Sequence, residues 1–313
     1  IDGANYGGTV RRGAVKGNPN LDIERITEYE VGTDLRFFKN ALSVGLTYYN
    51  RTTTDAILEL ELPASSGYSS TYENAAEISN KGIEADFSYA IVRNDNWNWD
   101  VFGNWTTYKN IVEKLPGVSR YILNGFTSTS SAVVEGAPFG AIYGGQYQRD
   151  ASGNIELDAD GFPLIDAEQG VIGDPNPDWR GGLGMSLAHK GFKFSFLFET
   201  SQGNDMWGGT SGVLHYFGIH PNTAVESTAT VDLPRYSGGF GGTIPAGTTF
   251  RGSIADFGGG PVALEEGWYR TNGGGFGDLD EQFVQDASWT KLREVSLSYS
   301  ISPKVLEKTF MNS

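Results

Sequence analysis

Carboxylates are the side chains in this sequence whose spacing comes nearest to a recognisable chemical site. The acidic stretch 150–178 holds the pattern D-x-D-G from Asp158, which matches half of a calcium-binding loop of the EF-hand type. That loop also needs a bidentate glutamate at its twelfth position, and the twelfth residue counted from Asp158 is Gln169. We therefore favour a solvated acidic turn region over a metal site, and we predict no metal and no other cofactor.

The sequence holds no group of residues typical of an enzyme. It contains no cysteine, which excludes a cysteine nucleophile, a thiolate metal site and a disulfide framework. It has no G-x-S-x-G motif, and His215 and His220 lack the spacing of metal ligands on a helix. Three glycine runs lack the lysine and the flanking strand and helix of a phosphate-binding loop, so we interpret them as mobile loop segments: 238–242, 258–260 and 272–275. The protein is therefore predicted not to be an enzyme.

Aromatic residues in the longest loop are the candidates for contact with a ligand. Each offers a large, rigid apolar face with a polar group at its edge, which suits stacking on a sugar ring or packing on a partner protein. Aromatic residues flanked by glycine can also simply anchor their own loop. The substrate-binding candidates are Trp207, Tyr216, Trp268 and Tyr269, with Phe217 beside them.

Pairs of acidic residues recur on segments whose polarity alternates with a period of two. In 25–38, Glu28 and Glu30 alternate with Tyr29 and Val31, and a strand places such sets on opposite faces. In a soluble sandwich the polar face is the outer surface, whereas in an outer-membrane barrel it lines the lumen. The candidates for lining a lumen are Glu28, Glu30, Asp34, Glu84, Asp86, Asp100, Lys193 and Glu199.

The elements that would position these residues are long strands joined alternately by short and long connections. The strands are expected at 25–38, 41–62, 72–91, 97–112, 177–189, 191–203 and 286–302. The tight turns are expected at Lys39-Asn40, Arg93–Asn96 and Lys190-Gly191, and the long connections at 63–71, 113–176 and 204–285. Short turns at one end, long loops at the other and strands of more than about nine residues are typical of a transmembrane barrel. We therefore predict an all-β fold, an antiparallel transmembrane β-barrel portion with long extracellular loops.

Two further features test this interpretation. In the last strand, Lys291 and Arg293 share the parity of the apolar Val295 and Leu297, so we expect these cations to lie above the membrane or past a bulge. Aromatic residues beside the short turns are expected to form an interfacial girdle, although they would be core rings in a sandwich: Phe37, Phe38, Tyr48, Tyr89, Trp97 and Trp99.

Composition excludes other classes of protein. The chain has 313 residues and a formal net charge of −15, which argues against nucleic acid as a partner. Without a run of 18 apolar residues, a membrane-spanning helix is not expected. A signal peptide is not expected either, because the chain begins with a polar stretch.

Six blocks of the sequence resemble, in order, the C-terminal half of the SusC/RagA family of TonB-dependent outer-membrane transporters. These are NPNLDIERITEYEVGTDLRFF at 18–38, YYNRTTTDAI at 48–57, NAAEISNKGIE at 74–84, VEGAPFGAIYGG at 134–145, GDPNPDWRGGLGMSLAHKGF at 173–192 and WTKLREVSLSY at 289–299.

The resemblance implies a barrel of about 22 strands with a plugged lumen, of which about seven strands lie here. It implies import of oligosaccharides or peptides across the bacterial outer membrane, a SusD-like lipoprotein lid, contact with outer-membrane lipid and energy from TonB. Residues 1–313 are then expected to be a partial C-terminal β-barrel domain, with the plug and the TonB-contacting segment of the N-terminal region absent. The alternative is a secreted all-β carbohydrate-binding or adhesin module that uses the same loop aromatics.

Overall fold

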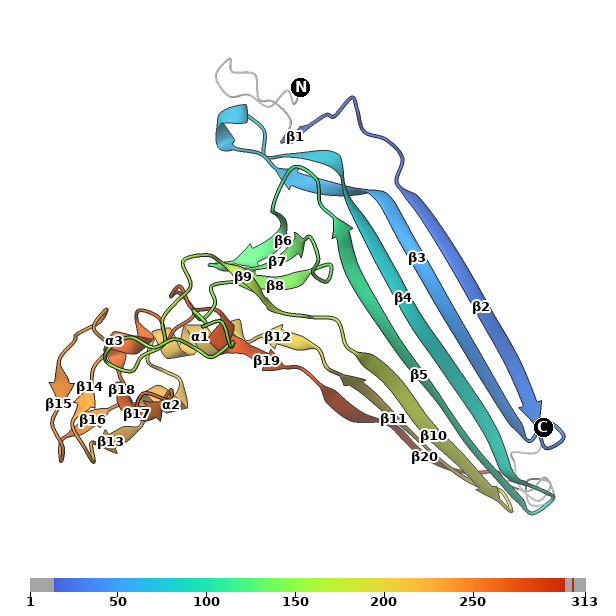
Figure 1. Cartoon of the computed structure of the whole chain (residues 1–313). Helices are drawn as coiled ribbons and strands as arrows, with labels where there is room; N and C mark the ends of the chain where they lie inside the picture. Colours follow the sequence, from blue (N-terminus) through green and yellow to red (C-terminus); the bar gives the residue numbers. More distant parts are fainter. Residues whose placement is uncertain (1–13, 302–305, 307–313) are drawn as a thin grey trace.

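Seven long strands form one antiparallel sheet in the computed structural model, which describes residues 14–301 and Leu306. In sheet order they are β2 (Arg25–Phe37), β3 (Leu42–Glu61), β4 (Ser70–Arg93), β5 (Trp97–Lys114), β10 (Trp179–His189), β11 (Phe192–Gln202) and β20 (Trp289–Tyr299). The short β1 (Val15–Lys16) pairs in parallel with β4. All seven predicted strands are confirmed with small shifts at their ends, and the expected end at 302 lies outside the described residues. The sheet is open, with β2 and β20 at its edges (Figure 1).

The predicted tight turns are present at one end of this sheet (Figure 1). Lys39 and Asn40 both have positive φ, of 53° and 67°, as do Lys190 and Gly191, at 45° and 89°. Such turns suit hairpins because their twist matches that of the strands they join. In the third turn, the side-chain oxygen of Asn94 accepts hydrogen bonds from two backbone amides, each at 2.9 Å.

The register separates a charged face of the sheet from an apolar face. Across the sheet, Asp34 pairs with Gly45, Gly45 with Asp86 and Asp86 with Asn104, all on one face. The other face carries hydrophobic side chains that remain exposed, such as Val31 at 74% and Leu297 at 71%. An apolar surface that extends over seven strands is far larger than soluble monomers usually expose, and it suits contact with lipid.

A bulge resolves the irregularity of the last strand. Leu197 pairs with Glu294, but the next residue, Phe198, pairs with Leu292, so Arg293 is an extra residue in β20. An extra residue reverses the parity of everything on its far side. Lys291 is therefore opposite Glu199 on the charged face. Of the two expected alternatives, the bulge is confirmed, with Lys291 past it and Arg293 at it.

The two longest connections fold into a loop body, which we define as residues 115–178 and 203–288. The first contributes a four-stranded sheet of β6 (Arg120–Phe126), β7 (Thr129–Val134), β8 (Ala141–Gly144) and β9 (Gly170–Gly173). The second contributes helices α1 (Gly209–Tyr216), α2 (Pro221–Ala224) and α3 (Glu266–Tyr269), and the four short two-stranded ladders of the described residues. These pair β12 (Asp205–Trp207) with β19 (Val284–Asp286), β13 (Glu226–Thr228) with β16 (Thr249–Arg251), β14 (Leu233–Pro234) with β15 (Thr243–Ile244), and β17 (Ser253–Asp256) with β18 (Pro261–Leu264).

Short 3₁₀ turns lie at Ala64–Ser66 and Glu281–Phe283. None of the helices among the described residues is long and apolar enough to span a membrane.

Both connections share a hydrophobic core and are joined by polar contacts. Phe162, from the first, is fully buried against Trp268 and Leu279 from the second. Asp280 is 1% exposed and accepts hydrogen bonds from the Gly145 amide at 2.9 Å and from the Ser128 hydroxyl at 2.8 Å. The two connections therefore form a single packed unit beside the sheet (Figure 1).

Some glycines of the three runs lie at close contacts between segments. Gly239 and Gly267 approach so closely that a Cβ on either would collide with the other's segment. Gly274 likewise lies against the backbone of Tyr269 and the side chain of Tyr216. Glycine is used here for close packing between segments, which the sequence pattern alone does not distinguish from flexibility.

Candidate functional site

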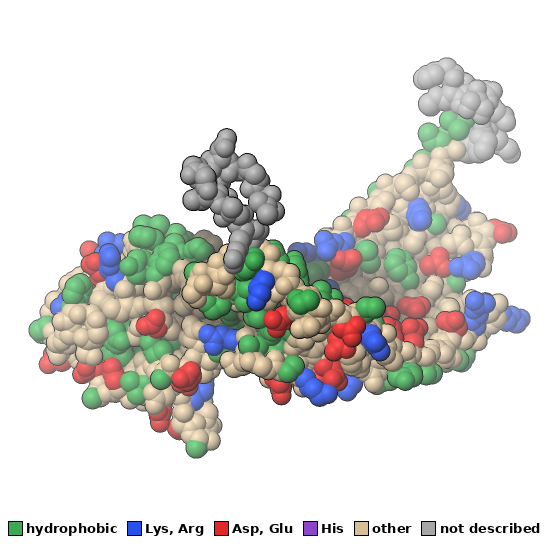
Figure 2. Space-filling model, turned by 90° about the horizontal axis from the view of Figure 1, so that it is seen from above, with side chains coloured by type: hydrophobic (Ala, Val, Ile, Leu, Met, Phe, Trp, Pro, Cys, Tyr) green, Lys and Arg blue, Asp and Glu red, His purple; other side chains and the backbone are tan. Residues whose placement is uncertain are grey.

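The charged face of the sheet brings the predicted lumen residues together. By register, the eight candidates lie on this one face: Glu28, Glu30, Asp34, Glu84, Asp86, Asp100, Lys193 and Glu199. Acidic and basic side chains gather over the sheet, to the right of the loop body, when the molecule is seen from above (Figure 2). Their use in lining a lumen stays a prediction.

A hollow of about 870 Å³ lies on this face between β4 and β20. Its charged lining residues are Glu84, Asp86, Arg180, Glu199 and Arg293. The Arg293 Nε atom lies 2.5 Å from a carboxylate oxygen of Glu199, and its guanidinium lies 5.4 Å from the Trp289 ring. The hollow thus offers charges of both signs next to an aromatic ring, which is a surface suited to polar cargo.

Sequence reasoning missed three residues of this hollow. Arg180 has the same parity as Gly182 and Ser186 and pairs with Thr106, so the alternation in β10 could have revealed it. Arg293 was hidden because the bulge reverses its parity, and Trp289 lies beyond the same bulge. The parity of Lys291 and Arg293 indicated a bulge as one alternative, but a bulge depends on pairing with a neighbouring strand, so only the structure placed it.

The aromatic residues near the short turns agree with the girdle for the most part. Phe38 is 72% exposed and Trp97 is 42% exposed, which is inconsistent with core rings of a sandwich. Trp97 stacks on His189 at 3.8 Å, next to the β10–β11 turn. The placement of Tyr48 was wrong, because it pairs with Val31 and Ile83 well inside β3 and away from the turn.

The loop aromatics divide between core and surface. Trp268 is 2% exposed and packs 5.5 Å from Phe162 and 5.2 Å from Tyr236, measured between ring centroids. A ring enclosed in this way cannot stack on a ligand, so the candidate role of Trp268 is corrected to that of a core residue. Trp207 is half-buried beside Phe126 and lies outside the pocket described next.

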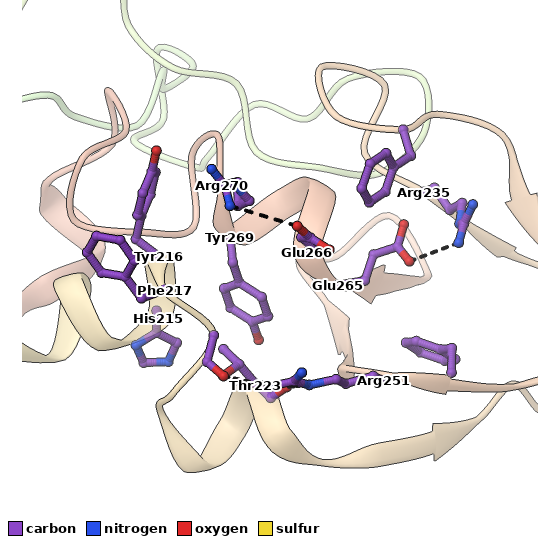
Figure 3. Close-up of a pocket in the computed structure, with 13 residues that line it drawn as sticks. His215, Tyr216, Phe217, Thr223, Arg235, Arg251, Glu265, Glu266, Tyr269 and Arg270 are labelled. Carbon is purple, nitrogen blue, oxygen red and sulfur yellow. Dashed lines mark hydrogen bonds and ion pairs between the residues drawn. The ribbon is translucent and has the colours of Figure 1, made fainter.

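Tyr216 and Tyr269, with Phe217, line a pocket of about 390 Å³ in the loop body (Figure 3). Tyr269 projects from α3 into the middle of this pocket, with His215 on one side and Glu265 on the other (Figure 3). Burial raises the pKa of Tyr269, so its hydroxyl, 3.3 Å from that of Ser253, stays protonated. This pocket, which we call the loop pocket, brings together three of the aromatic residues singled out in the sequence.

The acidic stretch uses its carboxylates to hold its own turns. One oxygen of Asp158 accepts hydrogen bonds from the backbone amides of Asp160 and Phe162, each at 2.9 Å. Asp150 holds a similar turn through Ser152 and Asn154. Side chains that cap a turn in this way explain why aspartate recurs here.

His215, which borders the loop pocket, makes the loop body sensitive to acid. Burial lowers its pKa below the ordinary 6.5, outweighing the opposite effect of its hydrogen bond to the Ser211 carbonyl, and His220 stacks on it at 3.8 Å. Because the unfolded chain binds the proton more tightly, stability is lost as pH falls from about 6.5 towards the lower folded value.

We therefore expect the loop body to resist protease better at about pH 7.5 than at about pH 5.5, with the histidine neutral in the first case. His215→Gln should flatten this dependence, as measured by limited proteolysis across the range. A dependence that is unchanged in the variant would assign the effect to other groups.

A family model that matches almost the whole sequence decides the family of the chain. The family model described as TonB dependent receptor-like, beta-barrel matches residues 2–310. The chain belongs to this family. Members are outer-membrane β-barrel proteins, and the chain is a SusC/RagA-type barrel region.

Relatives and solved structures agree with the assignment. A TonB-dependent receptor of Formosa agariphila is 24% identical over 93% of this chain and 28% of its own length. The receptor SusC of Bacteroides thetaiotaomicron is 25% identical over 60% of this chain. The RagAB peptide importer in its closed-closed state shares the fold, with a TM-score of 0.63 at 19% identity, over 94% of this chain and 31% of that one. The chain thus spans less than a third of the length of these relatives.

Proposed function

We propose that residues 1–313 form part of the C-terminal barrel domain of an outer-membrane importer of oligosaccharides or peptides. The observation that carries the proposal is the two-faced sheet, with exposed hydrophobic side chains on one face and the charged hollow on the other. An outward apolar face contacts lipid, and a polar inner face forms the wall of the transport path. Membership of the family favours this over a secreted binding module.

The same proposal names the partners and excludes catalysis. One similar solved structure is titled as the RagAB peptide importer, and another relative is SusC, which supports a SusD-like lipoprotein as the lid of this transporter. TonB would act through another segment of the intact protein. The wall works by binding and positioning cargo, so we assign it no enzymatic activity and no cofactor.

The hollow on the charged face provides the test. Arg180→Ala and Trp289→Ala, made in the intact transporter, should reduce cargo uptake several-fold, because each removes a side chain that projects into the proposed path. Uptake is measured by mass spectrometry as depletion of a defined panel of linear oligosaccharides and tryptic peptides from the medium. The matched control is Leu187→Ala on the apolar face, which should import normally. Uptake that does not depend on the transporter at all would refute the proposal.

A further inference from the structure

The loop pocket has the properties of a built binding site separate from the charged face of the sheet. We propose that it binds a carboxylated sugar residue of a glycan. This rests on the proposed function, because it names the class of cargo and adds a second place where cargo is held.

A buried carboxylate with one unused oxygen is the central observation. The side chain of Glu265 is 9% exposed, and one of its oxygens pairs with an Nη of Arg235 at 3.0 Å. Its other oxygen and the Nε of Arg235 are both buried without a hydrogen-bond partner. Unpartnered buried polar groups are costly and rare, so this pair is suited to a ligand that supplies both a donor and an acceptor. Two neighbouring hydroxyl groups of a sugar supply both.

The ring of Phe240 lies beside this pair and lines the loop pocket. It lies 5.9 Å from the Arg235 guanidinium and is itself 61% exposed. The proposed ligand would reach the buried donor and acceptor when this exposed side chain changes its rotamer.

The charges around the loop pocket favour an anionic group in the ligand. Of the three arginines that line it, Arg235 pairs with Glu265 at 3.0 Å and Arg270 with Glu266 at 3.9 Å, so Arg251 is the cation left without a carboxylate partner among the described residues. Arg251 donates from Nε to the Thr223 carbonyl and from one Nη to the Gly218 carbonyl, so its remaining Nη keeps free donors. In a chain with a net charge of −15, a pocket whose charged lining residues leave one guanidinium unpaired favours an anionic ligand.

Aromatic rings complete the match to a sugar. Phe217 is 60% exposed at the edge of the pocket, and the Arg270 guanidinium lies 5.3 Å from the Tyr216 ring (Figure 3). Such rings stack on the apolar C–H face of a sugar, and the guanidinium groups beside them pair with a carboxylate. A uronic acid ring presents neighbouring hydroxyls, a carboxylate and an apolar face within one unit, and the pocket volume lies within the range of small-ligand sites.

The test is a binding measurement on the intact transporter purified in detergent. Trigalacturonate, the carboxylated probe, is titrated calorimetrically against neutral galactotriose and an acidic tripeptide. We expect trigalacturonate to bind about tenfold or more tightly than galactotriose, and Arg251→Gln to weaken it by about tenfold, because the guanidinium that would pair with the ligand's carboxylate is lost. Phe217→Ala, which changes an exposed ring with little risk to folding, should weaken binding several-fold. The control is Glu168→Gln, at an exposed position of the first connection, which should bind as the parent does.

Three results would overturn the inference. These are no binding of trigalacturonate, equal binding of galactotriose or of the tripeptide, or unchanged affinity in both pocket variants while they retain the parent's thermal midpoint. The uptake assay separates this failure from that of the proposed function. If Arg180→Ala reduces uptake several-fold while the loop-pocket variants bind and import as the parent does, only the inference about the loop pocket fails.

Discussion

Met185→Arg is expected to destabilise the membrane-embedded barrel by about 2–4 kcal/mol, the cost of a cation facing lipid near the bilayer midplane. Met185 lies near the middle of β10 on the apolar face, between Val101 of β5 and Phe196 of β11. The loss should appear as a lower urea midpoint in lipid vesicles and as less folded protein in the outer membrane.

The neighbouring residue provides the matched control. Ser186 lies at nearly the same depth but on the charged face, where it pairs with Asp100 and Ser195. Ser186→Arg places its charge beside a carboxylate on the polar side, so the change in stability should stay within about 1 kcal/mol. Equal effects of the two substitutions would contradict the assignment of the two faces to lipid and lumen.

Trp268→Ala should destabilise the loop body by about 3–5 kcal/mol, because it removes a large, almost fully buried ring and leaves a cavity. The ring contacts Phe162 from the first connection, so its loss should also loosen the two connections from each other. Pulse proteolysis of the loop body in increasing urea measures the change.

The control is the loss of an exposed aromatic residue from the same connection. Comparing the two variants separates the effect of core packing from the effect of losing any aromatic ring. Phe217→Ala should cost less than about 1 kcal/mol, since its ring is mostly in solvent. If Trp268→Ala kept normal protease resistance but bound cargo more weakly, the core role of Trp268 would be contradicted and its role in stacking on a ligand supported.

The strands, their turns and their two faces were predictable because the signals are local. Alternation with a period of two is a property of consecutive residues, as in Tyr29, Glu30 and Val31, and it survives whatever the strand pairs with. Turns such as Lys190-Gly191 are similarly encoded by residues that tolerate positive φ. The eight charged residues could therefore be placed on one face before any pairing was known.

The sequence by itself thus determined an all-β chain whose strands have one polar and one apolar face. It also determined that short turns alternate with long connections, and it carries the motif blocks of the family. The tertiary structure alone decided which side Lys291 and Arg293 take, because a bulge exists only relative to the partner strand. It also decided that Trp268 is core while Tyr216 and Phe217 line the loop pocket. Burial in an irregular loop body depends on contacts between residues more than 100 positions apart, as between Phe162 and Trp268, and such contacts leave no periodic trace in the sequence.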